Sequence, residues 1–191
     1  MALGVLSNNV CKPFDKNRDG MNVSEAIACL LLQTTKSQNC VEVCGVGYSS
    51  DAYHMTQPHP DGSKNAMKNA LQCANINAHE INYINAHGTG TMANDTSEAL
   101  AIQEVFSNTT KVSSTKSITG HTLGAAGAIE AIISSMVIQN QTIPTSTNLR
   151  DIENENINLS TKTTKEPVNY VLSNSFAFGG NNCSLVFGKV K

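Results

Sequence analysis

Two histidines and one lysine stand out among the side chains that could carry chemistry. His87 and His121 each occupy a loop rich in Gly and Thr after an expected strand. Lys116 lies in an otherwise uncharged loop just before His121. A lysine in such surroundings usually has a charged partner or a functional role. Taken singly, each of these residues is more often a packed or solvated side chain. Together they indicate one site built from two imidazoles and an ammonium group.

The elements expected around these residues alternate between strands and helices, which indicates an α/β fold. A short apolar strand at 81–86 runs into the loop 87–91, whose glycines allow a tight turn beside a ligand. A second strand at 111–114 precedes the loop 117–124. A buried helix at 125–139 begins with small residues that leave bare N–H groups beside His121, so its start is expected to face the site.

The rest of the chain is expected to supply further helices and strands. Helices are expected at 23–33, at 63–74, and from a capping box at 95–98 to about Phe106. Strands are expected at 41–49, 170–174 and 183–190, with a polar surface segment at 150–168. The stretch 175–182 is typical of a loop, in which two phenylalanines precede Gly179 and Gly180 and indicate a mobile gate.

Composition and charge exclude several classes of function. The chain has 191 residues, 40% of them hydrophobic and 15% charged, enough for one domain with a sizeable core. A net charge of −2, with neither sign concentrated, argues against nucleic-acid binding. The stretch 123–138 falls short of the ~20 apolar residues that a membrane span needs, and no secretory signal opens the chain. We therefore expect a cytoplasmic protein without a membrane span.

The cysteine pattern and the short motifs argue against metal and nucleotide sites. The six cysteines are expected to be free thiols, because a disulfide framework belongs to small secreted domains. Cys40 and Cys44 with His54 and His59 lack the close-paired spacing of zinc ligands. The stretch 45–50 lacks the third glycine of a dinucleotide fingerprint, and no P-loop, G-x-S-x-G elbow or H-E-x-x-H motif is present.

Three long motifs resemble, in order, those of β-ketoacyl-ACP synthases. They are residues 85–91 (NAHGTGT), 113–128 (SSTKSITGHTLGAAGA) and 174–182 (NSFAFGGNN), with support from 13–20 and 50–56. The resemblance covers nearly the whole chain but corresponds only to the C-terminal half of such an enzyme. It implies the C-terminal half of a thiolase-like fold, an α/β architecture with a mixed β-sheet layered between α-helices. Residues 1–37 would be the tail of the N-terminal half, and residues 38–191 the C-terminal ketoacyl-synthase domain.

The resemblance implies catalytic roles in the decarboxylative Claisen condensation of an acyl thioester with malonyl-ACP. His87 and His121 would donate hydrogen bonds to the oxygen of the thioester enolate, worth about 3 kcal/mol each by analogy with an oxyanion hole. Lys116 and Glu98 would orient the two imidazoles. We expect Lys116 to reach Glu98 or the backbone around His121, because an unpaired charge beside a dry acyl site is costly.

The resemblance also implies how substrates are held. Thr89 and Thr91 would bind the pantetheine amides, and Phe178, with Phe176 beside it, would gate the acyl pocket. No cofactor is implied, since the substrates are carried on the phosphopantetheine of acyl carrier protein, which is the expected partner.

The family's nucleophile is a cysteine in a small-residue elbow such as Ala-Cys-Ser, located in the half that this sequence does not match. Cys29 follows an alanine but lies in the expected helix at 23–33, and Cys183 precedes a serine in a terminal strand. The chain alone is therefore expected to be inactive and to need an N-terminal synthase half or an intact synthase subunit as partner. Members of the family are usually homodimers, so the resemblance also implies a homo-oligomer.

Two departures from the family pattern leave alternatives open. The stretch 24–28 (SEAIA) replaces a glycine-rich stretch, and 89–95 (TGTMAND) favours polyketide or aryl-polyene pathways over fatty acid synthesis. The alternatives are a non-catalytic partner subunit of an intact synthase, similar to a chain-length factor, and a degenerate gene fragment. Retention of both histidines argues against the partner subunit.

Overall fold

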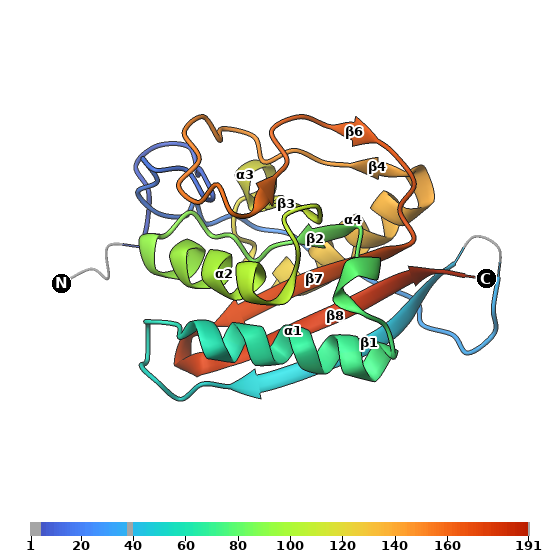
Figure 1. Cartoon of the computed structure of the whole chain (residues 1–191). Helices are drawn as coiled ribbons and strands as arrows, with labels where there is room; N and C mark the ends of the chain where they lie inside the picture. The colour runs from blue at the N-terminus through green and yellow to red at the C-terminus, as the bar shows by residue number, and fades with distance from the viewer. Residues whose placement is uncertain (1–4, 38–39, 191) are drawn as a thin grey trace.

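A mixed six-stranded sheet forms the centre of the computed structural model, which describes residues 5–37 and 40–190 (Figure 1). The strand order is β1-β8-β7-β2-β3-β5. The strands are β1 (Val41–Ser50), β2 (Tyr83–Asn85), β3 (Lys111–Ser113), β5 (Asn158–Leu159), β7 (Tyr170–Ala177) and β8 (Asn181–Lys189). A separate pair is formed by β4 (Thr142–Ile143) and β6 (Thr164–Lys165). Parallel pairing joins β7, β2, β3 and β5, whereas β8 is antiparallel to both β7 and β1.

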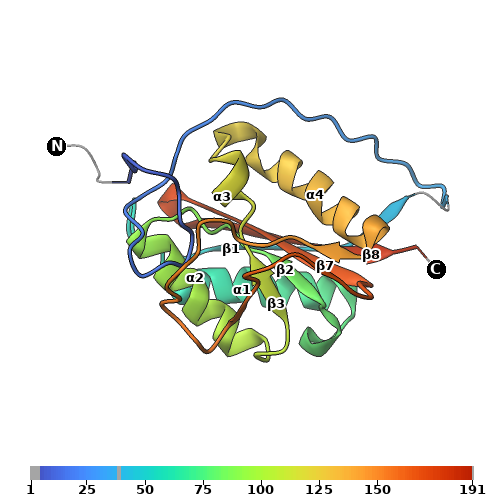
Figure 2. The ribbon, with the colours of Figure 1, turned by 90° about the horizontal axis from the view of Figure 1, so that it is seen from above.

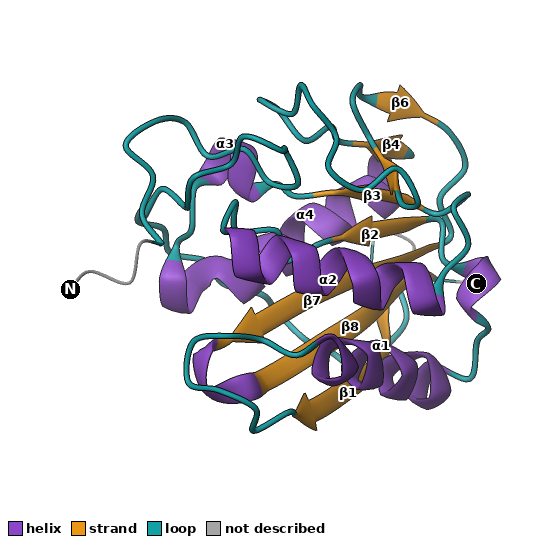
Figure 3. Ribbon diagram, turned by 60° about the vertical axis from the view of Figure 1, so that its left-hand side comes forward, coloured by secondary structure: helices purple, strands orange, loops and turns teal. Residues whose placement is uncertain are grey.

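Helices cover both faces of the sheet, as Figures 2 and 3 show. The helices α1 (Pro60–Ala74) and α2 (Met92–Val105) lie on one face, and α4 (Ala126–Asn140) lies on the other. Because strand side chains alternate between faces, Ile84 and Leu172 join the core beneath α1 and α2, while Tyr83 and Val171 join the core beneath α4. The expected α/β fold, a mixed sheet between helical layers, is confirmed.

Small residues let α1 lie close to β1. A Cβ atom on Gly47 would come within 2.1 Å of the Ala66 carbonyl oxygen, and one on Gly45 within 2.6 Å of the Ala70 carbonyl oxygen. The helix starts at Pro60, a residue suited to the first helical position because its missing N–H would have no intrahelical partner there. The expected helix at 63–74 therefore begins one turn earlier than its apolar pattern indicates.

The parallel strands end together and thereby gather the loops that follow them. Asn85 at the end of β2 is in register with Ser113 on β3 and Ser173 on β7. In α/β sheets, ligands bind outside the carboxyl ends of such strands. The loop with His87 and the short helix α3 (Lys116–Thr119) both leave the sheet at this edge.

The expected helix at 23–33 is wrong. This stretch is extended, and it arches over the same face of the sheet as α4 (Figure 2). Ile27 and Leu31, which a helix would turn inward, are 97% and 89% exposed. Most helical stability comes from packing of an apolar face, and nothing in the described residues packs against this one.

Three other expectations need correction. The helix α2 starts at Met92 with Thr91 as its N-cap, so the expected capping box at 95–98 is wrong. The loop expected at 175–182 is a short turn, η3 (Phe178–Gly180), between two long strands. The loop expected at 117–124 contains the end of α3 and the turn η2 (Leu123–Ala125). The predicted domain boundary, between residues 37 and 38, borders residues 38–39, which lie outside the described residues.

The stretch Leu123–Asn140 meets the length and apolarity required of a membrane-crossing helix, with a mean hydropathy of 1.2. Core helices of globular proteins meet the same criterion. In α4 one side packs on β7 and β8, and the carboxylate of Glu130 is buried in an ion pair with Lys116. These contacts are those of a core helix.

Candidate active site

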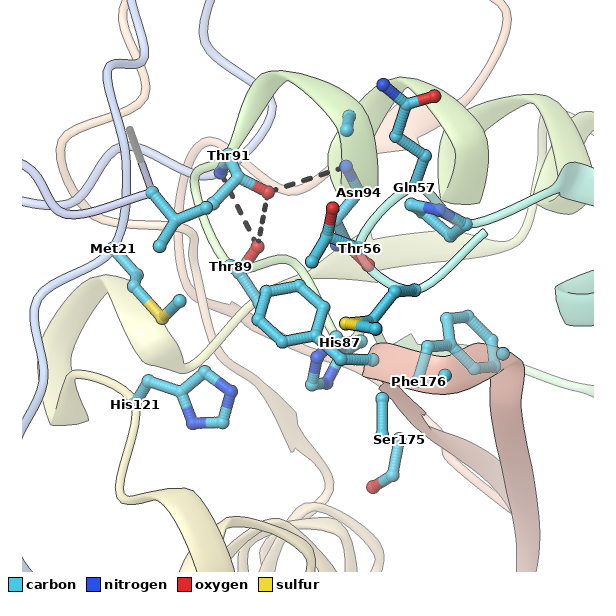
Figure 4. A pocket seen from close by; sticks show the side chains of 18 of the residues that line it. Met21, Thr56, Gln57, His87, Thr89, Thr91, Asn94, His121, Ser175 and Phe176 are labelled. Atoms are coloured by element: carbon cyan, nitrogen blue, oxygen red, sulfur yellow. Dashed lines mark hydrogen bonds between the residues drawn. The ribbon is translucent and has the colours of Figure 1, made fainter. Parts of the chain in front are cut away.

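A cavity of about 710 Å³ opens beside the carboxyl ends of the parallel strands (Figure 4). Six of the eight site residues expected from the sequence line it: His87, Thr89, Thr91, His121, Phe176 and Phe178. The other two, Lys116 and Glu98, are buried behind the lining. The structure therefore brings together residues that lie as far apart in the sequence as Thr89 and Phe178.

The two histidine rings meet edge to face, with centroids 5.4 Å apart and planes at 85°. Each ring has its Nδ1 atom occupied. The Leu123 backbone N–H donates to Nδ1 of His121 at 3.1 Å, and Nζ of Lys116, which can only donate, lies 3.3 Å from Nδ1 of His87. In a neutral imidazole whose Nδ1 accepts, the proton is on Nε2. Both rings therefore keep an Nε2–H group that can donate a hydrogen bond.

Both imidazoles are held in the neutral state. Burial, reinforced by the nearby Lys116 and by His121, holds the pKa of His87 well below its usual range. Burial and the Lys116 charge lower the pKa of His121 to about 4. Two neutral N–H donors in one cavity suit an oxygen that gains negative charge during a reaction.

Lys116 pairs with Glu130, and the expected contacts with Glu98 or with the backbone around His121 are wrong. Nζ of Lys116 donates to Oε1 of Glu130 on α4 in a very short contact, and both side chains are buried. Burial raises the pKa of the Glu130 carboxyl, while the ammonium of Lys116 opposes that rise. The sequence carried a signal for Glu130, because a lone carboxylate on a helix apolar around most of its circumference needs a partner.

Glu98 holds His87 through the backbone. Its carboxylate accepts hydrogen bonds from the N–H groups of His87 and Gly88, both at 2.8 Å, and from Nδ2 of Asn174 at 3.0 Å. Burial raises the pKa of Glu98 to about 7. The hydroxyl of Ser184 donates in turn to Asn174. Glu98 thus positions the loop that carries the imidazole, and it has no contact with Lys116.

Asp95, which the sequence assigned to a capping box, anchors the next part of the same loop. Its carboxylate accepts hydrogen bonds from the N–H groups of Thr89 and Gly90 and from that of Phe14 in the amino-terminal segment. The guanidinium of Arg18 lies 3.7 Å away and is equally buried. Burial raises the pKa of Asp95. The carboxylate of Asp95, one helical turn before Glu98, therefore anchors the loop and does not cap the helix.

The two threonines lie together on one wall of the cavity. Their hydroxyl oxygens are 2.9 Å apart, and Oγ1 of Thr91 accepts the N–H of Asn94 at the start of α2 (Figure 4). The sequence analysis predicted the two threonine hydroxyls at the site, but it did not predict the methionine side chains beside them. Met21, Met55 and Met92 also line the cavity, and methionine adapts easily to apolar ligands.

The two phenylalanines occupy different environments. Phe176 is buried at the end of β7 with its ring centroid 6.1 Å from that of His87, whereas Phe178 is 52% exposed at the cavity. The turn after Phe178 uses Gly179 with φ +81°, which L side chains rarely adopt. The N–H of Gly179 donates to the carbonyl of Met55 at 2.8 Å, so the turn is tied to the loop opposite.

Metal coordination finds no basis in residues 5–37 and 40–190, where no group of three or more His, Cys, Asp or Glu side chains could hold an ion. Three buried polar atoms on β2 and α4 remain unpaired in the described residues. Oε2 of Glu130, Nδ2 of Asn85 and Oγ of Ser134 are buried without a hydrogen-bond partner in the part of the chain that the structure describes.

Comparison with known proteins links this geometry to one family. The family described as "Beta-ketoacyl synthase, C-terminal domain" matches residues 40–150. The chain is 43% identical to the 3-oxoacyl-[acyl-carrier-protein] synthase 2 of Coxiella burnetii, a match that covers 94% of this chain and 46% of that protein. The chain thus spans about half the length of the curated relatives it matches.

Solved structures agree with the sequence comparison. The ishigamide ketosynthase/chain length factor superposes with a TM-score of 0.88 at 32% identity, covering 98% of this chain and 49% of that one. A type II PKS acyl-carrier protein in complex with its ketosynthase superposes with a TM-score of 0.86 at 27% identity, covering 100% of this chain and 52% of that one.

Proposed function

Because the chain belongs to the β-ketoacyl synthase family, whose C-terminal domain it carries, we propose that it supplies the decarboxylation site of a 3-oxoacyl-[acyl-carrier-protein] synthase. One observation carries this proposal: the rings of His87 and His121 meet edge to face in the cavity with their centroids 5.4 Å apart and a donor at each Nδ1. Since burial and the Lys116 charge lower the pKa of both imidazoles, each neutral ring would offer an Nε2–H group. The malonyl thioester would lose CO2, and its enolate oxygen would accept both N–H groups. The enolate carbon would then attack the acyl thioester carbonyl, and the enzyme's thiolate would leave.

The supporting residues suit the same reaction. The ammonium of Lys116, which is paired with Glu130, keeps His87 neutral, with its proton on Nε2. Thr89 and Thr91 would hold the pantetheine amides of acyl carrier protein, the partner that this function requires. A cavity with apolar walls would take the acyl chain and exclude water, which strengthens the hydrogen bonds to the enolate.

The acyl-accepting thiol would come from the amino-terminal half of a synthase. None of the six cysteines lines the cavity. Cys11 contacts a residue of the cavity lining, with its Sγ donating to the carbonyl oxygen of Thr89 at 3.2 Å, but burial raises its thiol pKa to about 11 and leaves it almost no thiolate. This chain alone is therefore expected to stabilise an enolate without forming an acyl-enzyme.

The test is reconstitution with an amino-terminal synthase half that carries an elbow cysteine. Release of CO2 from malonyl-ACP and formation of 3-oxoacyl-ACP are measured separately. We expect His87→Ala and His121→Ala each to slow decarboxylation about 100- to 1,000-fold, as loss of an oxyanion donor does. His79→Ala, outside the cavity, is the matched control. Stoichiometric acylation of the isolated chain at one of its own thiols, followed by condensation, would contradict the missing nucleophile.

Phe178 is proposed to act as a gate at the acyl pocket. Its exposed ring lies at the cavity on a turn with two glycines of positive φ. In the reconstituted enzyme, Phe178→Ala should change the preferred acyl length more than the rate of decarboxylation. Equal loss of both would rule out gating.

A second candidate is a partner subunit similar to a chain-length factor, favoured by the likeness to a ketosynthase/chain length factor structure and by the lack of a cavity cysteine. Adding the chain to an intact synthase distinguishes the two. A partner subunit would change product length and tolerate His87→Ala, whereas a catalytic half would not. Acyl length and pathway, whether fatty acid, polyketide or aryl-polyene, and a cytoplasmic location stay predictions.

A further inference from the structure

The backbone of His121 is held by residues 22–24, which lie far from it in the sequence. Val23 and His121 form an isolated parallel bridge. The His121 N–H donates to the carbonyl of Asn22 at 2.7 Å, and the Ser24 N–H donates to the carbonyl of His121 at 3.1 Å. Both backbone polar groups of the histidine are therefore paired with this short segment.

The turn that carries His121 needs such support because it is irregular. It lies between Gly120 at φ +68° and Leu123 at φ +51°, both in the left-handed region. A residue with a side chain, such as Leu123, keeps this conformation only when the surrounding contacts hold it there. His121 itself belongs to no helix or named strand. Its position is therefore set by its contacts with other segments.

The hydroxyl of Ser24 adds a contact that no backbone group could supply. Half-buried Ser24 donates from Oγ to the carbonyl of Thr119 at 2.6 Å. Thr119 is the last residue of α3, and carbonyl groups at a helix end lack partners within the helix. The same helix starts at Lys116, whose Nζ lies 3.3 Å from Nδ1 of His87. One side chain thus joins the turn of His121 to the helix of Lys116.

The fit between Ser24 and the turn is close. A Cβ atom on Gly120 would come within 2.7 Å of Oγ and 2.9 Å of Cβ of Ser24. Residue 120 must therefore lack a side chain for Ser24 to reach Thr119. Ser24 also opens the stretch 24–28, which departs from the glycine-rich pattern of the family. This departure places a hydrogen-bond donor directly behind His121.

The support is itself fixed to the amino-terminal segment. Oδ1 of Asn22 accepts the N–H of Cys11 at 2.7 Å, and its Nδ2 donates to the carbonyl of Asn9 at 2.8 Å. Met21, the residue before Asn22, lines the same cavity as His121 (Figure 4). Residues 22–24 can therefore act as a fixed support for the histidine.

We propose that Ser24 is a positioning residue for His121, and that its hydroxyl fastens the turn at residues 120–123 to α3 and so fixes the imidazole against that of His87. Ser24 does not line the cavity, so it acts through His121. Its effect on decarboxylation rests on the proposed function. The positioning itself is a property of this chain and can be measured without any catalysis.

The first test is an NMR titration of the imidazoles in the full chain, with the His121 signal assigned from His121→Asn. Burial and the Lys116 charge lower the pKa of His121 to about 4. In Ser24→Ala the turn loses its tie to α3, so the ring becomes more hydrated and its pKa should rise to about 5 or higher. The titratable groups that contact this ring or line its cavity, or that carry a charge acting on it, are His87, Lys116, His54 and Asp19.

Two further variants separate the hydroxyl from general effects of substitution. Ser24→Thr keeps the donor, and because Gly120 leaves space beside it, the pKa of His121 should return to about its wild-type value of about 4. Ser107→Ala is the matched control, since it removes an exposed hydroxyl that is bonded to Thr109 outside the cavity. It should leave the titration of His121 unchanged.

The second test measures rates in the enzyme reconstituted with an amino-terminal synthase half. Ser24→Ala should lower kcat for CO2 release from malonyl-ACP about tenfold, since a small displacement of a catalytic group is costly. KM should stay nearly unchanged, because Thr89 and Thr91 would still hold the pantetheine. Ser24→Thr should recover most of the lost rate.

The outcomes distinguish this proposal from the proposed function. An unchanged His121 pKa in Ser24→Ala overturns the positioning role, even if the variant melts at a lower temperature. A raised pKa that Ser24→Thr does not restore also overturns it, because the hydroxyl is then not the cause. A raised and restored pKa with unchanged CO2 release supports the positioning role and refutes only the part proposed for His121 in decarboxylation.

Discussion

Residues 5–22 and residues 23–32 are neighbours in the chain, and both lack regular helix or a paired strand, but they are held very differently. The first segment is tied down by buried polar groups. Phe14 donates to Asp95, and Asp15 accepts from the N–H groups of Arg150 and Asp151. The second segment is held by hydrogen bonds only at its start, where Ser24 donates to the carbonyl groups of His121 and Thr119, and its exposed side chains beyond are largely aliphatic. An irregular segment can thus be well positioned when its polar groups are hydrogen-bonded. An apolar segment can be held in place only by packing against an apolar surface.

Of the changes considered, the loss of Asp95, which anchors residues 5–22, should lower the free energy of unfolding most. Asp95→Ala removes one of the two carboxylates that face the guanidinium of buried Arg18, leaving Glu153, and it removes the acceptor for three backbone N–H groups. Loss of one partner from a buried pair costs about 3–5 kcal/mol. We expect urea unfolding to show a loss of this size and trypsin to cleave within residues 5–22. A variant that unfolds like the wild type would show that the anchor lies elsewhere.

Variants of Lys116 and Glu130 test whether buried charges hold the candidate site in place, as they hold residues 5–22. Lys116→Met should cost about 2–4 kcal/mol because Glu130 is left buried without its cation. Adding Glu130→Leu should recover much of that loss, since neither charge is then buried. Chemical denaturation of the two single variants and the double variant measures the coupling. Additive losses would contradict a direct pair.

The pH dependence of His121 should have a smaller effect. Its pKa falls from about 6.5 in the unfolded chain to about 4 in the folded one, so below pH 6.5 the unfolded state binds more protons. The stability that His121 contributes is therefore complete above pH 6.5 and is lost as the pH falls toward 4. Relative to His121→Asn, the wild type should lose on the order of 2 kcal/mol between pH 7 and pH 4. Parallel pH profiles would refute the depressed pKa.

The smallest effect is expected in segment 23–32 of the isolated chain. Ile27→Ser should change the free energy of unfolding by less than about 0.5 kcal/mol, because the side chain is 97% exposed and loses no contact. Thermal unfolding of the wild type and the variant measures the difference. A loss above about 1 kcal/mol would mean that Ile27 is packed against the chain in solution.

Much of the candidate site could be predicted because it is carried by local motifs. The loops with His87, Lys116 and His121 follow short strands, and glycines mark where the backbone turns. Such features depend on neighbours within a few residues. The partners of these residues could not be predicted, since Glu98 and Glu130 both lie on expected helices and nothing local shows which of the two carboxylates faces Lys116.

The amino-terminal stretch shows the same limit for the fold. Leu30 and Leu31 stand at helical spacing with Ile27, and the same residues fit an extended strand. Periodicity reports only which side chains share a face, whereas packing decides whether that face is used. Asp95 was similarly assigned to a helix cap by its spacing from Glu98, but Thr91 caps the helix and Asp95 binds the loop.

The sequence by itself determined the alternation of strands and helices, the glycine-bearing loops, and the side chains that would meet at the edge of a parallel sheet. These follow from backbone preferences and from short-range spacing. Only the tertiary structure decided that Lys116 pairs with Glu130, that both imidazoles are neutral, and that residues 23–32 remain extended and uncovered. Those outcomes depend on burial and on charges brought close by folding, which no local pattern contains.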